Sequence, residues 1–324
     1  MNLRRRHLAA LTATLALTAP TLGHTADTYP NRIIKLVVAF PAGGDTDALA
    51  RPYAEQLTKR LGQNVVVENR AGAGGSIGTS HVARAEPDGY TLMFTPNTHP
   101  IIPHVLPTGV NYHAVDDFTP IINTGTSPFA LVASNASGIT SIQNFVDQVK
   151  AGKNLSYGTP GAGSPMHVVG EMLLHAAGIQ STPVHYRGNA PLMTDVLGGH
   201  IPVAVVTPGV IFQHVETDKL KALAVTSPER TPVLPKVPTL QESGYNVTLN
   251  AWWGVFAPKG TPAAIINKIN AALNEGLKEP KVLKQMADMG VIPAGGTPER
   301  MAELNANDFK LYEQTVKQFG ISVQ

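Results

Sequence analysis

The chain has 324 residues, a formal net charge of +2 at pH 7 and no cysteine. Without cysteine it forms no disulfide, has no thiolate metal ligand and offers no lipid-anchor cysteine. A nucleic-acid partner would require a basic face, and the charge balance gives no support for one. The length exceeds that of one comfortable core, which predicts two domains.

The first 26 residues are typical of a secretory signal peptide. Three arginines at positions 4–6 precede an apolar stretch at 8–17, and small residues follow. We expect cleavage after Gly23 or Ala26, by the Sec or the twin-arginine route. Cleavage after Ala26 removes three arginines and no acid, which leaves 22 basic and 23 acidic side chains. No later stretch reaches 18 apolar residues, so we expect a soluble, periplasmic mature chain.

Strand-forming runs and helical patterns alternate through the first part of the mature chain. The order of strand, loop and helix implies parallel pairing with right-handed crossovers. Pro52 is expected to kink its helix or to delay the helix start. Predicted strands cover residues 33–40, 64–69 and 91–95, and predicted helices cover residues 47–61 and a segment from the glycine loop 71–78 to about Ala85.

A second alternating region follows two extended segments within residues 118–134, and the chain returns through an extended run at 248–258. This order predicts two crossing strands that act as a hinge beside a cleft. We predict one domain from residues 27–123 and 251–324 and another from 124–250, although a single doubly wound domain with appended helices also fits. The remaining predicted strands cover residues 155–159, 183–188, 201–207 and 222–227, and the remaining predicted helices cover 141–151, 166–177, 190–197, 262–278, 280–289 and 298–318.

Glycine-rich corners join several predicted strands to the helices that follow. The corners at 41–45, 71–78 and 160–165 are strong, and one at 186–191 is weaker. Such corners face the ligand crevice of an open α/β sheet, and the N–H groups at a helix start bind anions. None ends in the Gly-Lys-Ser/Thr of a P-loop, and Ile77 stands where a dinucleotide fingerprint needs its third glycine. The corners therefore disfavour a nucleotide.

Ser76 lies within a G-x-S-x-G pattern at residues 74–78, which is typical of a serine hydrolase. Such a nucleophile elbow directly follows a strand, whereas here the predicted strand ends near Asn69, before a glycine loop. His167 or His214 would complete a catalytic triad only if the fold brought it close to the serine. Ester hydrolysis is kept as an alternative function.

Two pairs of side chains are candidate metal ligands. His99 and His104 are five residues apart, off any one helix face, and neighbouring prolines predict a loop there. His167 and Glu171 are four residues apart on a predicted helix, with no third ligand near in sequence. We interpret the second pair as an ordinary i,i+4 contact and predict neither a metal nor a cofactor.

A backbone nest without lysine suits a small carboxylate. Each N–H bond to a charged oxygen contributes about 1.5–3 kcal/mol, so three or four can hold a small acid. Asp45 and Asp47 stand beside the first corner, and Asp is a preferred N-cap residue. We expect a capping role ahead of ligand contact for both, and we keep Asp45 as a candidate ligand contact.

Seven stretches between Tyr29 and Gly320 carry a family likeness, at residues 40–51, 68–78, 86–92, 157–167, 185–199, 220–245 and 252–262. Together they resemble the Bug-type periplasmic solute-binding proteins of tripartite tricarboxylate transporters. The resemblance implies an α/β, two-domain periplasmic-binding-protein fold (Venus flytrap, type II-like). It also implies a monomer without enzymatic activity that captures a small carboxylate and delivers it to membrane subunits of such a transporter. A periplasmic sensor that binds the same ligand is the alternative.

The resemblance also implies which residues surround the ligand. Ala42, Gly43 and Gly44 would form the carboxylate nest, and the other residues follow strand ends in both domains. In the first domain the full set is Phe40, Ala42, Gly43, Gly44, Asp45, Thr95 and Asn97. In the second domain it is Thr159, Ala162, Gly163, Ser164, His167, Tyr186, Arg187, Gly188 and Thr207.

Two positions depart from the family pattern. His185 stands where the family usually has proline, and Thr207 and Pro208 stand where many members have an acidic residue. The missing acid removes a partner for an amine, which disfavours an amino-acid ligand. A dicarboxylate or an aromatic acid is therefore the expected ligand.

Overall fold

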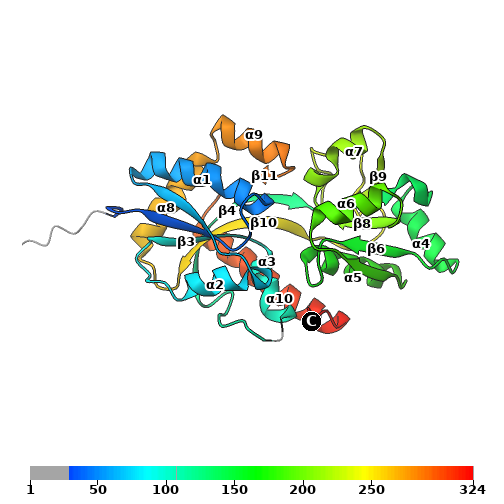
Figure 1. Cartoon of the computed structure of the whole chain (residues 1–324), viewed down its shortest axis with the longest axis horizontal. Helices are drawn as coiled ribbons and strands as arrows, with labels where there is room; N and C mark the ends of the chain where they lie inside the picture. The colour runs from blue at the N-terminus through cyan, green and yellow to red at the C-terminus, as the bar shows by residue number, and fades with distance from the viewer. Residues whose placement is uncertain (1–28, 107, 324) are drawn as a thin grey trace, which may run out of the picture.

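The computed structural model describes residues 29–106 and 108–323, so the predicted signal peptide lies outside the described residues. Figure 1 shows two lobes side by side, each with one β-sheet at its centre and helices packed around it. Two strands, β4 and β10, run along the middle of the molecule towards the junction of the lobes. None of the helices in the described part of the chain has the length and apolar character of a membrane span.

The first sheet has six strands in the order β11-β4-β10-β3-β1-β2. β1 pairs with β2 and β3 in parallel, whereas β10 is antiparallel to both β3 and β4. Its strands are β1 (Ile34–Val38), β2 (Val65–Asn69), β3 (Thr91–Pro96), β4 (Phe118–Pro128), β10 (Asn250–Pro258) and β11 (Ile292–Pro293). Its helices are α1 (Asp45–Leu61), α2 (Ser76–Ala83), α3 (Thr98–Val105), α8 (Ala263–Gly276), α9 (Pro280–Asp288) and α10 (Pro298–Phe319).

The second sheet has five strands in the order β7-β6-β8-β5-β9. β6 pairs in parallel with both β7 and β8, so the carboxyl ends of these three strands lie at one edge. Its strands are β5 (Ala130–Ser134), β6 (Ser156–Thr159), β7 (Thr182–His185), β8 (Val203–Val206) and β9 (Leu220–Val225). Its helices are α4 (Ile142–Lys150), α5 (Pro165–Ala177), α6 (Asn189–Leu197) and α7 (Phe212–Glu216), with short 3₁₀ turns η1 (Ala73–Gly75), η2 (Asn135–Ser137) and η3 (Pro208–Val210) elsewhere in the chain.

The chain crosses between the sheets twice. On the way out only Phe129 separates β4 from β5, and on the way back residues 226–249 lead from β9 into β10. Thr226 joins the two crossings, because its hydroxyl accepts from the Phe129 N–H at 2.8 Å and donates to the Leu249 carbonyl. These are the two crossing strands that the sequence predicts. The predicted domain limits within the chain stay a prediction.

Each face of the first sheet buries its own apolar cluster. Trp252 and Phe256 of β10 pack on one face with Met301 of α10, whereas Trp253 belongs to the cluster on the other face with Tyr53 of α1. The two tryptophans are 1% and 7% exposed. Their burial agrees with a packing role, because buried aromatic side chains contribute mainly apolar area.

Helix α1 begins at Asp45 and continues through Pro52, so the proline does not delay the helix start. Proline lacks the N–H that would bond the carbonyl four residues earlier, which belongs to Ala48. The side-chain amide of Gln285, on α9, donates to that carbonyl at 2.6 Å. A side chain from a distant helix therefore replaces the bond that the proline removes.

The loop predicted around His99 and His104 is wrong, because these residues lie on α3. Pro100 falls in the first turn, where no backbone N–H is needed for an intrahelical bond. His99 is buried and its Nε2 lies 2.8 Å from the Ala114 carbonyl. His104 instead packs against Phe309, with tilted rings whose centroids are 4.3 Å apart, so the two imidazoles do not share a site.

Candidate functional site

The predicted ligand-binding residues lie at or just beyond the carboxyl ends of parallel strands in both sheets. In α/β folds these ends face the ligand crevice. Phe40, Ala42, Gly43, Gly44 and Asp45 follow β1, whereas Thr95 and Asn97 end β3. Thr159, Ala162, Gly163, Ser164 and His167 belong to the β6–α5 connection, Tyr186, Arg187 and Gly188 follow β7, and Thr207 follows β8.

The first corner, residues 40–44, is closed by its own helix. Gly43 has φ +80°, and its N–H donates to Oδ2 of Asp47 at 2.9 Å. The Gly44 N–H donates to the Pro41 carbonyl at 3.3 Å. Gly44 is the N-cap of α1, so the expectation that Asp45 caps the helix is wrong. The N–H groups of the first turn of α1 remain for an anion, because a helix start has no internal partners for them.

Asp47 holds the first corner together. Arg51 donates to both of its carboxylate oxygens at 2.9 Å, and Asn69 of β2 donates to Oδ1 at 2.9 Å. Burial alone would raise the pKa of Asp47, but the bonds from Gly43, Arg51 and Asn69 and the Arg51 charge hold this pKa below its usual range. The carboxylate is therefore ionised at neutral pH and stays bound to the corner.

Asp45 differs from Asp47, two residues later. Its side chain is solvent-exposed and forms no hydrogen bond with any other residue in the described ranges. Desolvation by the surrounding protein raises its pKa above the ordinary value. A carboxylate in this position repels an incoming anion, so the ligand must be held by groups that outweigh Asp45.

Thr95 and Asn97 are placed inside the protein, 1% and 2% exposed. The Asn97 side-chain amide donates to the Asn250 carbonyl at 3.2 Å and to the Tyr312 hydroxyl at 2.8 Å. Both of its amide hydrogens are thus engaged with β10 and α10. In this conformation Asn97 joins the end of β3 to the returning strand.

The second corner, residues 160–164, repeats the geometry of the first. Gly163 has φ +67°, and its N–H donates to Nδ1 of His167 at 3.1 Å. Ser164 caps α5 by accepting from the His167 N–H, and its hydroxyl donates to the Gly161 carbonyl at 2.7 Å. Ala162, between the glycines, is half-buried. Pro165 at the first helical position suits this start, since no N–H is needed there.

A cluster of titratable side chains supports the second corner from behind. His167 Nε2 lies 3.7 Å from Oε1 of Glu171, which also accepts from the Tyr157 hydroxyl at 2.6 Å. The His185 ring lies 4.3 Å from the His167 ring, and its Nδ1 lies 2.9 Å from the Thr159 hydroxyl. Burial lowers the pKa of His185, and a positive charge on His167 would lower it further. Burial opposes ionisation of Glu171, but the contacts with His167 and Tyr157 and any positive charge on the two histidines lower its pKa overall.

The corner after β7 is tied to the second corner. The Gly188 N–H donates to the Pro160 carbonyl at 2.9 Å. The Tyr186 hydroxyl donates to Asp195 of α6 at 2.6 Å; burial and that carboxylate raise the tyrosine pKa to about 12. Arg187, between them, is exposed and forms no ion pair within residues 29–106 and 108–323. Its guanidinium is therefore available to an anion.

The second corner also contacts the other lobe. A Cβ built on Gly163 would lie 2.7 Å from Val323 Cγ2 and 3.1 Å from Val105 Cβ, so only glycine fits without displacement. The Val323 N–H donates to the Val105 carbonyl at 2.9 Å, which fixes the last described residue against α3. The position of this corner therefore depends on how the lobes are arranged.

The connection after β8 meets the first lobe on a second side. Thr207 is half-buried and precedes the turn η3. A Cβ on Gly209 would lie 2.4 Å from the Met289 carbonyl oxygen, and one on Gly290 would lie 3.4 Å from Pro208 Cβ. The second lobe therefore contacts the first lobe at two places, at Gly163 and at Gly209, and its predicted ligand-binding residues lie between these contacts.

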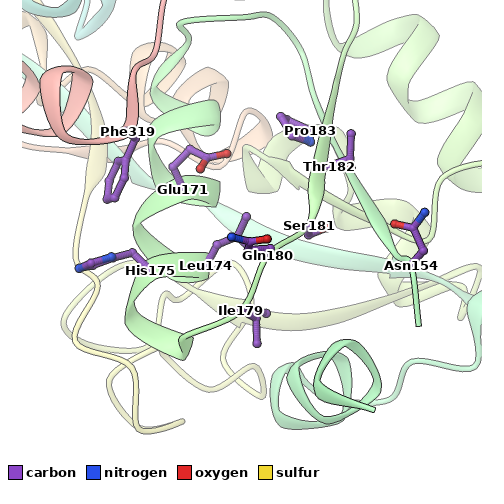
Figure 2. A pocket seen from close by; sticks show the side chains of 10 residues that line it. All are labelled: Asn154, Glu171, Leu174, His175, Ile179, Gln180, Ser181, Thr182, Pro183 and Phe319. Carbon is purple, nitrogen blue, oxygen red and sulfur yellow. The ribbon is translucent and has the colours of Figure 1, made fainter. Parts of the chain in front are cut away.

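A groove of about 670 Å³ lies on the flank of the second lobe, between α5 and the edge strand β7. Figure 2 shows the Glu171 carboxylate directed across it towards Thr182 and Pro183, and Phe319 of α10 on the other side of α5. None of the predicted ligand-binding residues lines it. The lining residues are Asn154, Glu171, Leu174, His175, Ile179, Gln180, Ser181, Thr182, Pro183 and Phe319.

The geometry supports neither ester hydrolysis at Ser76 nor a metal site at the candidate ligands. Ser76 is buried at the start of α2, and no histidine bonds to it in the described part of the chain. Among residues 29–106 and 108–323, no group of three His, Asp or Glu side chains is placed to hold a metal ion. His167 and Glu171 form the i,i+4 contact that the spacing predicts.

Sequence reasoning gave the residues that close the two corners other roles, because it expected Asp47 to cap its helix and His167 to contact the ligand. Asp47 and His167 each stand four residues after a glycine with positive φ and at the third position of a helix. A polar residue at that position commonly reaches back to a backbone N–H, as in a capping box. This spacing was visible in the sequence. Asn69 supports the first corner from the neighbouring strand β2 and leaves no local signal, whereas Tyr157 supports the second corner from β6, through Glu171.

Residues 49–321 match the family described as the tripartite tricarboxylate transporter family receptor, TctC. The chain belongs to this family. It is 33% identical to protein BugT of Bordetella pertussis over 96% of each chain. The structure resembles MatC of Rhodopseudomonas palustris with bound malate (TM-score 0.77, 29% identity, 89% of this chain and 100% of that one). It also resembles an R. palustris protein with adipate (TM-score 0.80, 30% identity, 91% and 99%).

The receptor is thus a periplasmic solute-binding protein, and its predicted Bug-type membership and two-lobed α/β fold are confirmed. Members of this family bind solutes, in agreement with the prediction that the chain is not an enzyme. The likeness extends over both lobes, because the compared structures are covered almost completely.

Proposed function

We propose that this receptor captures a small dicarboxylate between its lobes and delivers it to the membrane subunits of a tripartite tricarboxylate transporter. The observation that carries the proposal is the arrangement of strand-end corners. Arg187 at one corner forms no ion pair among the described residues, and the first-turn N–H groups of α1 lie at another corner. A dianion suits an arrangement with donors on both lobes, because each carboxylate can engage one lobe.

Relatives support the class of ligand. One relative of known structure holds malate and another holds adipate, and both are dicarboxylates. No acidic residue follows β8 at Thr207 and Pro208, so that corner offers no partner for the amine of an amino acid. Asp45 at the first corner is the only carboxylate among the predicted contacts, so the donors of the other corners face no competing acid.

A thermal-shift screen tests the proposal directly. The mature receptor is heated with malate, adipate, a tricarboxylate, an aromatic acid and an amino acid, each from micromolar to millimolar concentration. A ligand at 100 times its Kd stabilises the folded state by about 2.7 kcal/mol, which gives a clear upward shift in Tm. We expect the dicarboxylates to give the largest shift. A flat response to every acid would refute carboxylate capture.

Arg187→Gln tests the contribution of the second lobe. We expect Kd for the best dicarboxylate to rise about tenfold, because a charge-assisted hydrogen bond is lost from an exposed site. The matched control is Arg300→Gln, which removes an exposed arginine on the first turn of α10 and should leave Kd unchanged. Isothermal titration calorimetry measures both. Equal effects of the two substitutions would show that Arg187 acts only through net charge.

Delivery is tested in cells. Deletion of the cognate membrane subunits should abolish uptake of the radiolabelled dicarboxylate while the purified receptor still binds it. If uptake persists without those subunits, this class of transporter is not the route by which the captured dicarboxylate enters the cell.

A further inference from the structure

The imidazole of His167 makes the second corner sensitive to protonation. A backbone N–H can only donate, so the 3.1 Å contact from Gly163 requires Nδ1 of His167 to accept. The ring is then neutral and carries its proton on Nε2, which faces Glu171. If Nδ1 gained a proton, it would become a donor that faces the Gly163 N–H donor, and the hydrogen bond between them would break.

The surroundings of His167 can accommodate a positive charge. On its own helix Glu171 lies 3.7 Å from Nε2, and Tyr157 of β6 holds that carboxylate in place. On β7 the only titratable neighbour is His185, whose ring is 4.3 Å away, and β6 adds the neutral Thr159 beside it. From the other lobe, the atoms nearest to a Cβ built on Gly163 belong to the apolar side chains of Val105 and Val323. One carboxylate and one second imidazole therefore decide the charge on His167.

Solvent reaches this cluster from the flank. Figure 2 shows the Glu171 carboxylate at the groove between α5 and β7, beside Thr182 and Pro183. Protons can therefore exchange with the cluster even when the lobes are closed around a ligand.

We propose that His167 is a positioning residue that couples carboxylate capture to the uptake of one proton. This inference rests on the proposed function and names its regulation. With His167 neutral, the Gly163 N–H is bound to Nδ1. When the ring gains a proton at Nδ1, the Gly163 N–H turns to a ligand oxygen, and the imidazolium adds a positive charge behind the corner. No covalent bond changes, and the proton comes from solvent.

The coupling predicts tighter binding at lower pH. Histidine in peptides titrates near pH 6.5, within the range that a periplasm experiences. If the carboxylate binds the protonated corner about ten times more tightly than the neutral one, affinity falls about tenfold as the ring becomes neutral. The carboxyl groups of the probes are mostly ionised above about pH 6, and the profile of His167→Asn measures what their residual titration contributes.

Calorimetry with malate and adipate between pH 6 and pH 8 provides the test, in two buffers with different ionisation enthalpies. The native receptor should take up a proton on binding, and Kd should rise about tenfold over the range. His167→Asn keeps an acceptor near the position of Nδ1 and cannot titrate. It should bind without proton uptake and with a flat pH profile, near the affinity of the native receptor at pH 8.

Two matched variants separate the histidines. His175→Asn makes the same change on the same helix, away from the corner, and should keep the native pH profile. His185→Asn should keep the profile with its midpoint moved to higher pH, because a repelling neighbour is removed. A flat profile in His185→Asn, or a native profile in His167→Asn, overturns the proposal. Binding of either acid without proton uptake overturns it while leaving the proposed function intact.

A ligand-free measurement is independent of the proposed function. The ¹⁵N resonances of the His167 ring should show the proton on Nε2 at pH 8, and the Gly163 amide resonance should follow the titration of that ring. His167→Asn should abolish the response of the amide. A proton on Nδ1 at pH 8, or a Gly163 amide that ignores pH, overturns the proposal. Failure of every acid to bind overturns the proposed function and with it the coupling.

Discussion

The first corner (residues 40–44) and the second corner (residues 160–164) have the same backbone geometry. They differ in the side chain that accepts a hydrogen bond from the glycine N–H. In each, a glycine with positive φ donates its N–H to the side chain four residues later, at the third position of the helix. The acceptor is Asp47 in the first lobe and His167 in the second. A carboxylate held by an arginine stays ionised at any physiological pH, whereas an imidazole titrates there. The same motif therefore gives one fixed corner and one adjustable corner.

The surroundings of the two corners reinforce this difference. Asp47 is bound by Gly43, Arg51 and Asn69, so four N–H donors from three residues surround one buried acceptor. A Cβ on Gly43 meets nothing within 4 Å, whereas one on Gly163 meets the other lobe. The first corner is thus rigid and open to solvent, and the second is adjustable and packed between the lobes. A receptor that must hold an anion and also close over it can divide these tasks between its corners.

Asp47→Ala should have the largest effect on stability. It leaves the Gly43 N–H without its acceptor and removes one of the two acceptors of the Asn69 amide, and breaking a buried charged network costs about 3 kcal/mol. Because the folded pKa of Asp47 is lowered, its contribution is present above the unfolded pKa near 4 and is lost as pH falls through the folded value. Urea unfolding at pH 7 and in acid measures both.

His167→Ala is the matched substitution at the second corner. It removes one acceptor for one backbone N–H, so we expect a loss of about 1 kcal/mol in the free energy of unfolding. The difference between the Asp47 and His167 variants should shrink in acid, where the Asp47 contribution disappears. Equal losses at pH 7 would contradict the view that the first corner is the rigid one.

Much of this contrast could be predicted from the residues around each corner, and part could not. Strand-glycine-helix order located both corners, because glycine and helix-start residues act locally. The alternating pattern also located β1, β6 and the helices after them within one or two residues. The identity of the N-cap was missed, since Asp45 and Gly44 are neighbours and either is a common cap residue.

The supporting contacts lay beyond sequence reasoning. Asn69 reaches Asp47 from the next strand, and Val323 reaches Gly163 from the end of the chain. Such pairs depend on how sheets and lobes pack, which no local pattern encodes. Likewise Thr95 and Asn97 follow a strand end as ligand-binding residues do, yet their burial under β10 and α10 depends on the returning strand.

Alanine at the two corner glycines should separate backbone strain from lobe packing. Gly43→Ala places a side chain at positive φ in open space, which costs about 1 kcal/mol. Gly163→Ala carries the same strain and also displaces Val323 and Val105, for a total of about 2 kcal/mol. Free energies of unfolding in urea measure the difference.

A double-mutant cycle tests the assignment of the extra cost to the other lobe. Val323→Ala shortens the side chain nearest Gly163, so the cost of Gly163→Ala should fall towards that of Gly43→Ala in this background. The cost of Gly43→Ala should not change. If Gly163→Ala costs the same with and without the valine, the packing between the lobes does not constrain this corner.

Gln285→Ala should have an effect no larger than that of Gly43→Ala, and it probes the helix behind the first corner. Its side-chain amide donates to the Ala48 carbonyl, which Pro52 leaves without an N–H partner, so its loss should cost about 1 kcal/mol. In a Pro52→Ala background residue 52 supplies its own N–H, and the cost of Gln285→Ala should fall to a few tenths of a kcal/mol. Additive losses would show that Gln285 acts by packing alone. Helix α5 has its proline at the first position, where no N–H is needed, so it requires no such partner. The helix of the first corner therefore depends on a residue of α9, whereas the helix of the second corner needs no other element for this purpose.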